Sequence, residues 1–148
     1  MRTMIIYLCF NSGLMRYEII DHTADIGIKA YGRSIEEAFE NAAYGMFDII
    51  SDTSKVEPVG EYLIRLESDS LEELLVDFLS ELLYIFEVQH LIFGKFEVKL
   101  DGTKLEARIF GEKFNPEKHP KGIEIKAVTY HILEVNASEG YVKVLFDI

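Results

Sequence analysis

The chain has 148 residues, 49% of them hydrophobic, which is enough for one domain with a substantial core. Asp and Glu number 26 against 15 Lys and Arg, giving a formal net charge of −11. Proteins that grip nucleic acid directly use Lys and Arg against phosphate, so this composition argues against tight, independent nucleic-acid binding. The single cysteine excludes a disulfide framework and a CxxC-type zinc site, and it favours a reducing, cytoplasmic location.

The N-terminal segment is apolar from Met4 to Phe10, but this stretch is too short to cross a bilayer. No small-residue cleavage pattern follows it, so we expect neither a membrane span nor a signal peptide. Met15 stands just before the first convincing strand. We therefore expect residues 1–14 to be an extension, either from an upstream start or as a flexible arm, and residues 15–148 to form one domain.

Strands and helices alternate in the first part of the chain. Ser34 and Ser70 are each followed three residues later by glutamate, a capping box that satisfies the exposed amides at the start of a helix. Apolar residues recur at helical spacing after each serine, which predicts two amphipathic helices. A run of bulky residues predicts a strand at 16–20, and period-two alternation predicts strands at 26–31 and 61–67.

From Leu91 onward the pattern predicts strands only. Asp101-Gly102 favours a tight hairpin, because glycine adopts positive φ readily. We expect strands at 93–100, 104–110, 123–135 and 141–148, with a loop at 115–122 and a second hairpin turn at 136–140. The sequence thus predicts a single α+β domain in which two amphipathic helices pack on a mainly antiparallel β-sheet.

The common catalytic motifs are absent from the sequence. It contains no GxSxG nucleophile elbow, no GxxxxGK[ST] or GxGxxG phosphate loop, and no HxxxH or HExxH zinc spacing. The four histidines are better explained as surface or hydrogen-bonded residues than as zinc ligands.

Two acidic regions remain as candidate sites. In Asp21-His22-Thr23-Ala24-Asp25, two carboxylates and an imidazole crowd the connection between the first two strands. This composition suits either a turn stabilised by its own side chains or a cation site. At the chain end, Asp147 precedes Ile148, so a side-chain carboxylate and the terminal carboxylate lie one residue apart. The end is either frayed or docked, and the apolar strand that leads into it favours docking.

Five segments, taken in order, resemble the archease family over about residues 16–148. The most distinctive is His22-Thr23-Ala24-Asp25-Ile26-Gly27, within Tyr17–Gly27. The others are Ala30–Phe39, Gly111–Pro120, Lys126-Ala127-Val128-Thr129-Tyr130-His131, and the closing Phe146-Asp147-Ile148.

The resemblance implies a divalent metal site made by Asp25, Asp147 and the terminal carboxylate of Ile148. Calcium is the implied ion, although all-oxygen ligation also admits magnesium or manganese. His22, Lys126 and His131 belong to the same motifs and are expected to support the site or to contact a partner.

The resemblance further implies a protein cofactor rather than an enzyme. The implied partner is the RtcB-type tRNA-splicing RNA ligase. The protein cofactor would promote guanylylation of the ligase and its multiple turnover, and it would broaden the range of nucleotides that the ligase uses. Two other functions stay open at this stage. One is a metal-dependent phosphoester hydrolase, and the other is a chaperone-like binding module with a structural metal.

Overall fold

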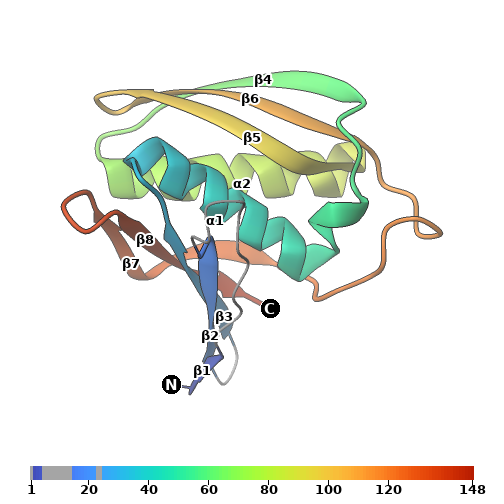
Figure 1. Ribbon diagram of the computed structural model, residues 1–148, viewed down its shortest axis with the longest axis horizontal. Helices are drawn as coiled ribbons and strands as arrows, with labels where there is room; N and C mark the ends of the chain where they lie inside the picture. Colours follow the sequence, from blue (N-terminus) through green and yellow to red (C-terminus); the bar gives the residue numbers. More distant parts are fainter. Residues whose placement is uncertain (1, 5–14, 23–24) are drawn as a thin grey trace.

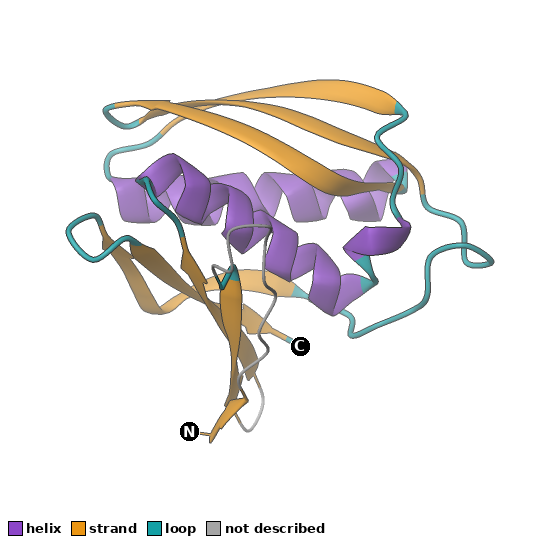
Figure 2. Cartoon of the chain, in the orientation of Figure 1, coloured by secondary structure: helices purple, strands orange, loops and turns teal. Residues whose placement is uncertain are grey.

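The computed structural model describes residues 2–4, 15–22 and 25–148. Two helices and two β-sheets make up this part of the chain (Figures 1 and 2). In chain order the elements are β1 (Arg2–Met4), β2 (Tyr17–His22), β3 (Asp25–Tyr31), α1 (Ile35–Ile50), the 3-10 turn η1 (Thr53–Lys55), β4 (Gly60–Glu67), α2 (Leu71–Gln89), β5 (Leu91–Asp101), β6 (Lys104–Lys113), β7 (Ala127–Asn136) and β8 (Tyr141–Asp147).

The two helices lie between the two sheets, so the domain has three layers (Figure 1). One sheet has five strands in the order β1-β2-β3-β8-β7, and the other has three in the order β4-β6-β5. All the strand pairings are antiparallel. The predicted α+β class is confirmed, and the single sheet of the prediction is in fact two sheets on opposite sides of the helices.

Both helices begin at the predicted capping serines. The Ser34 hydroxyl accepts a hydrogen bond from the backbone amide of Glu37 at 3.1 Å, and the Ser70 hydroxyl accepts one from Glu73 at 3.1 Å. Helix α1 buries more than one stripe, because it contacts β3 on one side and β5 on the other. Even the polar Asn41 is buried, where its amide donates to the Tyr31 carbonyl at 2.6 Å.

The five-stranded sheet brings the two ends of the sequence together. β3 and β8 are more than 100 residues apart in the sequence, yet they pair along their whole lengths. Their alternate residues point into the core, and these are Ile26, Ile28, Ala30, Val142, Val144 and Phe146. This pairing fixes which residues of the two strands lie side by side on the opposite, outer face.

Both predicted hairpin turns are confirmed, whereas the predicted start of one strand is wrong. Gly102 and Gly140 both have positive φ, 58° and 74°, as the turns require. The strand expected at 123–135 begins instead at Ala127, because the backbone amides of Gly122 and Ile123 bond to the end of α1 rather than to a strand. β7 is also interrupted by a bulge between Thr129 and Glu134.

The N-terminal predictions are only partly within the described residues. Arg2–Met4 forms β1, which pairs with β2 at the edge of the five-stranded sheet. Cys9 and the remainder of the expected 1–14 extension lie outside the described residues, so a domain beginning at residue 15 stays a prediction. Neither described helix is both long and apolar enough to span a membrane.

Candidate metal and partner site

Two aspartates face each other across neighbouring strands at one end of the five-stranded sheet. Asp25 is the first residue of β3 and Asp147 is the last residue of β8, and the antiparallel register pairs them directly. Side chains at directly opposed positions share a face, with Cβ atoms about 5 Å apart. The start of β3 and the end of β8 therefore lie side by side, and they bring two carboxylates to the outer face.

The chain end beside these aspartates is held by main-chain and core contacts. On the other side of β8, Ala127 of β7 is the register partner of Asp147. The Lys126 amide donates to the Asp147 carbonyl at 2.7 Å. The Ile148 side chain is partly buried and packs against the core. These contacts hold Ile148, the residue that follows Asp147, against the domain.

The glycine that ends the HTADIG motif allows the neighbouring strand to come close. A Cβ on Gly27 would lie 2.9 Å from both the Leu145 side chain and the Val144 carbonyl oxygen of β8. Distances below 3 Å do not occur for real Cβ atoms, so a larger residue would push β8 away from β3. Gly27 thus permits the close spacing of β3 and β8 beside the Asp25–Asp147 pair.

The other predicted residues lie around this pair rather than all within it. His22 is the last residue of β2 and its backbone pairs with Asp25 of β3, while its side chain lies outside the described residues. Lys126 is exposed and immediately precedes Ala127, the β7 residue that pairs with Asp147. His131 is exposed and lies in the β7 bulge, beyond the row that contains the two aspartates.

The β7 bulge is long and strained. Between the pairs Thr129–Leu145 and Glu134–Lys143, β7 advances five residues while β8 advances two. Within it Ile132 has φ of +53°, a conformation that costs a β-branched residue roughly 1–3 kcal/mol. The Thr129 hydroxyl accepts the His131 amide at 3.3 Å and so helps to hold the bulge in place.

The oxygen donors at this end of the sheet suit a hard divalent cation. Carboxylates are the preferred protein ligands of Ca²⁺, and they also bind Mg²⁺ and Mn²⁺. Among the described residues, no three side chains of His, Cys, Asp or Glu group together to hold a metal ion. A site here would therefore need a donor beyond the side chains of Asp25 and Asp147.

Comparison with known proteins identifies the family. The profile of the archease protein family matches residues 17–148. The chain belongs to the archease family. It is 46% identical to the protein archease of Sulfolobus acidocaldarius over 86% of this chain and 93% of that protein. With the protein archease of Methanosarcina mazei it shares 50% identity over 84% of this chain and 89% of that protein.

Solved structures agree with this assignment. The solution structure of a Methanobacterium thermoautotrophicum protein superposes with a TM-score of 0.79 at 40% identity, covering 90% of this chain and 99% of that one. A crystal structure of an archease from Thermotoga maritima, described as a possible chaperone, has a TM-score of 0.61 at 24% identity, covering 87% of this chain and 94% of that one. The latter likeness supports the fold alone.

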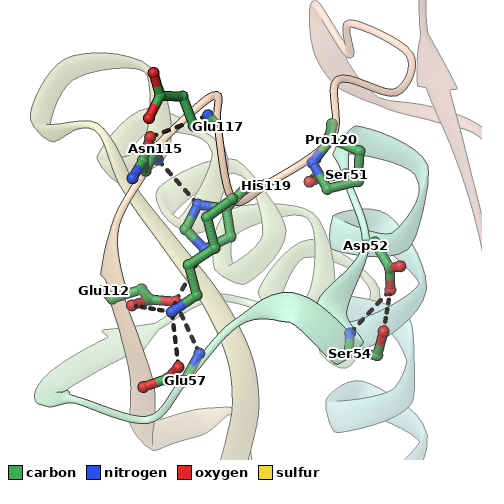
Figure 3. Close-up of polar contacts among 10 residues, drawn as sticks. Ser51, Asp52, Ser54, Glu57, Glu112, Asn115, Glu117, His119 and Pro120 are labelled. Atoms are coloured by element: carbon green, nitrogen blue, oxygen red, sulfur yellow. Dashed lines mark hydrogen bonds and ion pairs between the residues drawn. The ribbon is translucent and has the colours of Figure 1, made fainter.

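A second polar cluster, which the sequence did not reveal, holds the loop between β6 and β7 (Figure 3). The His119 side chain is fully buried and stacks on the Phe114 ring at 5.6 Å. Its Nδ1 accepts the Asn115 amide at 2.9 Å, so Nε2 carries the proton and donates to Glu112 Oε2 at 2.9 Å. Lys118 Nζ also donates to Glu112 at 2.9 Å. The cluster thus ties the loop to the end of β6.

The charge of Glu112 is strongly favoured in the folded state. Burial alone would raise the pKa of Glu112, but hydrogen bonds from the Glu57 amide, Lys118 and His119 outweigh it and lower the pKa from 4.5 to about 2. A folded-state pKa below the unfolded value contributes stability that is present above pH 4.5 and is lost as the pH falls towards 2. The lowering corresponds to at most about 3 kcal/mol.

We therefore expect Glu112→Gln to lower the free energy of unfolding by up to about 3 kcal/mol near neutral pH and to have little effect near pH 2. Urea unfolding of both proteins at several pH values between 2 and 7 measures the difference. Glu106→Gln is the matched control, since the Glu106 carboxylate is about half exposed and pairs with Arg65 on the outer face of the three-stranded sheet. If the free energies of unfolding of wild type and Glu112→Gln differed by the same amount at every pH, the lowered pKa of Glu112 would be contradicted.

Proposed function

We propose that the chain is a protein activator of an RtcB-type RNA ligase rather than an enzyme with its own substrate. The observation that carries the proposal is the cross-strand pairing of Asp25 with Asp147 beside the chain end. Membership of the archease family supports it. The sequence also contains neither a GxSxG nucleophile elbow nor a GxxxxGK[ST] or GxGxxG phosphate loop.

In this proposal Asp25, Asp147 and the terminal carboxylate of Ile148 hold a divalent ion, calcium in the first instance and magnesium or manganese otherwise. When bound, such an ion supplies a concentrated positive charge that attracts phosphate oxygens. The aspartates keep it at the end of a rigid sheet, which positions it more exactly than a loop would. His22, Lys126 and His131 support the site or contact the ligase.

The acidic character of the chain suits such a partner. An RNA ligase has a basic surface for its substrate, and the net charge of −11 on this chain would steer the two proteins together. Because the ion neutralises part of the carboxylate cluster, the paired aspartates can approach a phosphate-binding pocket without strong repulsion. The activator then favours the ligase conformation that accepts guanylate, which restores the enzyme for further turnovers.

The direct test is a guanylylation time course of the cognate ligase with GTP and metal, in the presence and absence of the chain. We expect the chain to accelerate guanylate transfer and to convert single into multiple turnover. The same preparation, incubated with nucleotides and phosphoesters but without ligase, should release no product above buffer. Ligase turnover unchanged by the chain would refute the proposal, and metal-dependent hydrolysis by the chain alone would favour a hydrolase.

A chaperone-like binding module is the second candidate, because another member of the archease family, the archease from Thermotoga maritima, is described as a possible chaperone. It differs in its expected selectivity. A general chaperone would suppress aggregation of several unrelated client proteins, whereas a dedicated activator would affect the ligase alone. Light-scattering assays with two unrelated aggregating proteins separate these functions.

A further inference from the structure

The described part of the chain contains an apolar pocket of about 650 Å³ that the carboxylate site does not use. It lies between the C-terminal ends of α1 and α2 and the loop that joins β6 to β7. Its apolar lining includes Ile50, Leu83, Phe86, Phe114, Ile123 and Ile125. This volume and lining are typical of a binding site for a bulky apolar group.

The loop side of the pocket is fixed by hydrogen bonds to the end of α1. The Gly122 amide donates to the Ile50 carbonyl at 2.9 Å, and the Ile123 amide donates to Ile49 at 2.8 Å. The Ser51 hydroxyl donates to the Pro120 carbonyl at 2.5 Å, on the side of the loop shown in Figure 3. A Cβ on Gly122 would lie 2.3 Å from the Ile49 carbonyl oxygen, so only glycine permits this approach. The pocket is therefore preformed, and filling it requires little ordering of the loop.

The pocket is directly connected to the carboxylate site. Ile125 lines the pocket and is only 2% exposed, and the next residue, Lys126, donates its backbone amide to Asp147. A single residue thus separates the pocket wall from the strand that carries Asp147. The backbone of one wall of the pocket therefore continues directly into the strand pair that carries Asp147.

The charged residues at the rim of the pocket favour a partner in which the apolar side chain stands next to a basic residue. Glu87 and Glu124 line it and are exposed, against one lysine, Lys121, in the same lining. The chain as a whole carries a net charge of −11. Exposed carboxylates around an apolar centre are the arrangement of an interface in which a buried anchor residue is surrounded by a polar rim.

We propose that this pocket is the anchor point for the ligase: it takes an aromatic or branched apolar side chain of the ligase that stands next to a basic residue. The proposal rests on the proposed function, and it adds the surface through which the partner is held. The pocket supplies affinity, and the aspartate pair supplies the activating ion. Binding and activation are therefore separable by mutation.

The test compares Ile123→Glu with Leu63→Glu, each measured for affinity to the ligase and for activation at saturating concentration. The two side chains are similarly exposed, 44% and 50%, but Ile123 lines the pocket whereas Leu63 lies on β4 in the three-stranded sheet and does not. We expect Ile123→Glu to raise the Kd at least about tenfold, as the loss of a central interface contact does, with activation recovered when the variant saturates the ligase. Leu63→Glu should leave both values unchanged. Thermal melts of the two variants check that each remains folded.

The outcomes distinguish this inference from the proposed function. If wild type activates the ligase and both variants bind it equally well, the docking site is wrong while the activator function stands. If wild type neither binds nor activates the ligase, both are overturned. If Ile123→Glu instead dissociates a homodimer in sedimentation velocity without changing the affinity for the ligase, the pocket holds a second copy of the chain, and the proposal is also overturned.

Discussion

Replacing Asp147 with asparagine is expected to stabilise the metal-free protein and, at the same time, to abolish its stabilisation by calcium. Asp25 and Asp147 are direct partners across two strands, and like charges in that arrangement destabilise by roughly 0.2–1 kcal/mol. Asparagine removes one of the two charges and keeps the size of the side chain. In the wild type, calcium at about 100 times its Kd would add about 2.7 kcal/mol to the free energy of unfolding.

Thermal unfolding in EDTA and in a calcium titration measures both effects. The variant should melt slightly above the wild type in EDTA and well below it in calcium. Asp101→Asn is the matched control, because Asp101 is the exposed last residue of β5 in the other sheet. This variant should respond to calcium as the wild type does. Equal calcium stabilisation of Asp147→Asn and the wild type would mean that Asp147 is not a ligand.

The same variant should lose ligase activation, and a second substitution should cost little more. Second-shell changes already weaken metal binding by roughly 10–100-fold, so loss of a direct ligand should weaken it at least about 100-fold. If Asp25 and Asp147 share one ion, Asp25→Asn, Asp147→Asn and the double variant should be nearly equally inactive. Losses that multiply in the double variant would indicate two independent roles instead of a shared cation.

Local sequence signals predicted the local structure well. The two capping boxes mark the observed helix starts, and the glycine at 102 marks an observed turn with positive φ. These features depend on residues three or four positions apart, so they can be recognised without knowledge of the fold. The Asp25 and Asp147 regions were also recognisable, from acidic crowding in one case and from an apolar strand leading to the chain end in the other.

The layer arrangement was harder to predict, because it depends on contacts between distant residues. An apolar stripe on α1 indicates one buried side, but Ala43 and Ile49 are buried as well, since a sheet covers the helix on each side. In β7 the bulge adds an odd number of residues, so Thr129 and Glu134 share a face although one position is odd and the other even. Simple alternation cannot follow a strand through such a change.

His119 illustrates a further limit. A histidine between lysine and proline in a polar loop has the sequence context of a surface residue, yet it is 1% exposed. Its partners explain this burial, because the Asn115 amide and the Glu112 carboxylate satisfy both ring nitrogens. The sequence signal that could have revealed the burial of His119 is the nearby Glu112. That signal can be interpreted only when the loop is known to fold back on β6.

Phe47→Ala is expected to cause the largest loss of stability among these variants. The Phe47 side chain is fully buried on α1, and its ring lies 6.2 Å from that of Phe86 on α2 and 5.9 Å from those of Phe93 and Phe96 on β5. Truncation of such a residue removes apolar contact area and leaves a cavity, at a cost of about 3–5 kcal/mol. Urea unfolding should show a lower midpoint with an unchanged slope.

The same substitution on the outer surface provides the control and tests the layered architecture. Phe110 lies on β6, where Lys95 and Arg108 approach its ring at 4.9 and 5.5 Å, and Phe110→Ala should cost about 1 kcal/mol or less. Because α1 packs against both sheets, weakening its contacts with β5 should destabilise the five-stranded sheet equally. Hydrogen exchange of Phe47→Ala should therefore show β3 and β8 opening together with β5. Loss of protection confined to the three-stranded sheet would mean that the sheet carrying Asp25 and Asp147 folds independently of it.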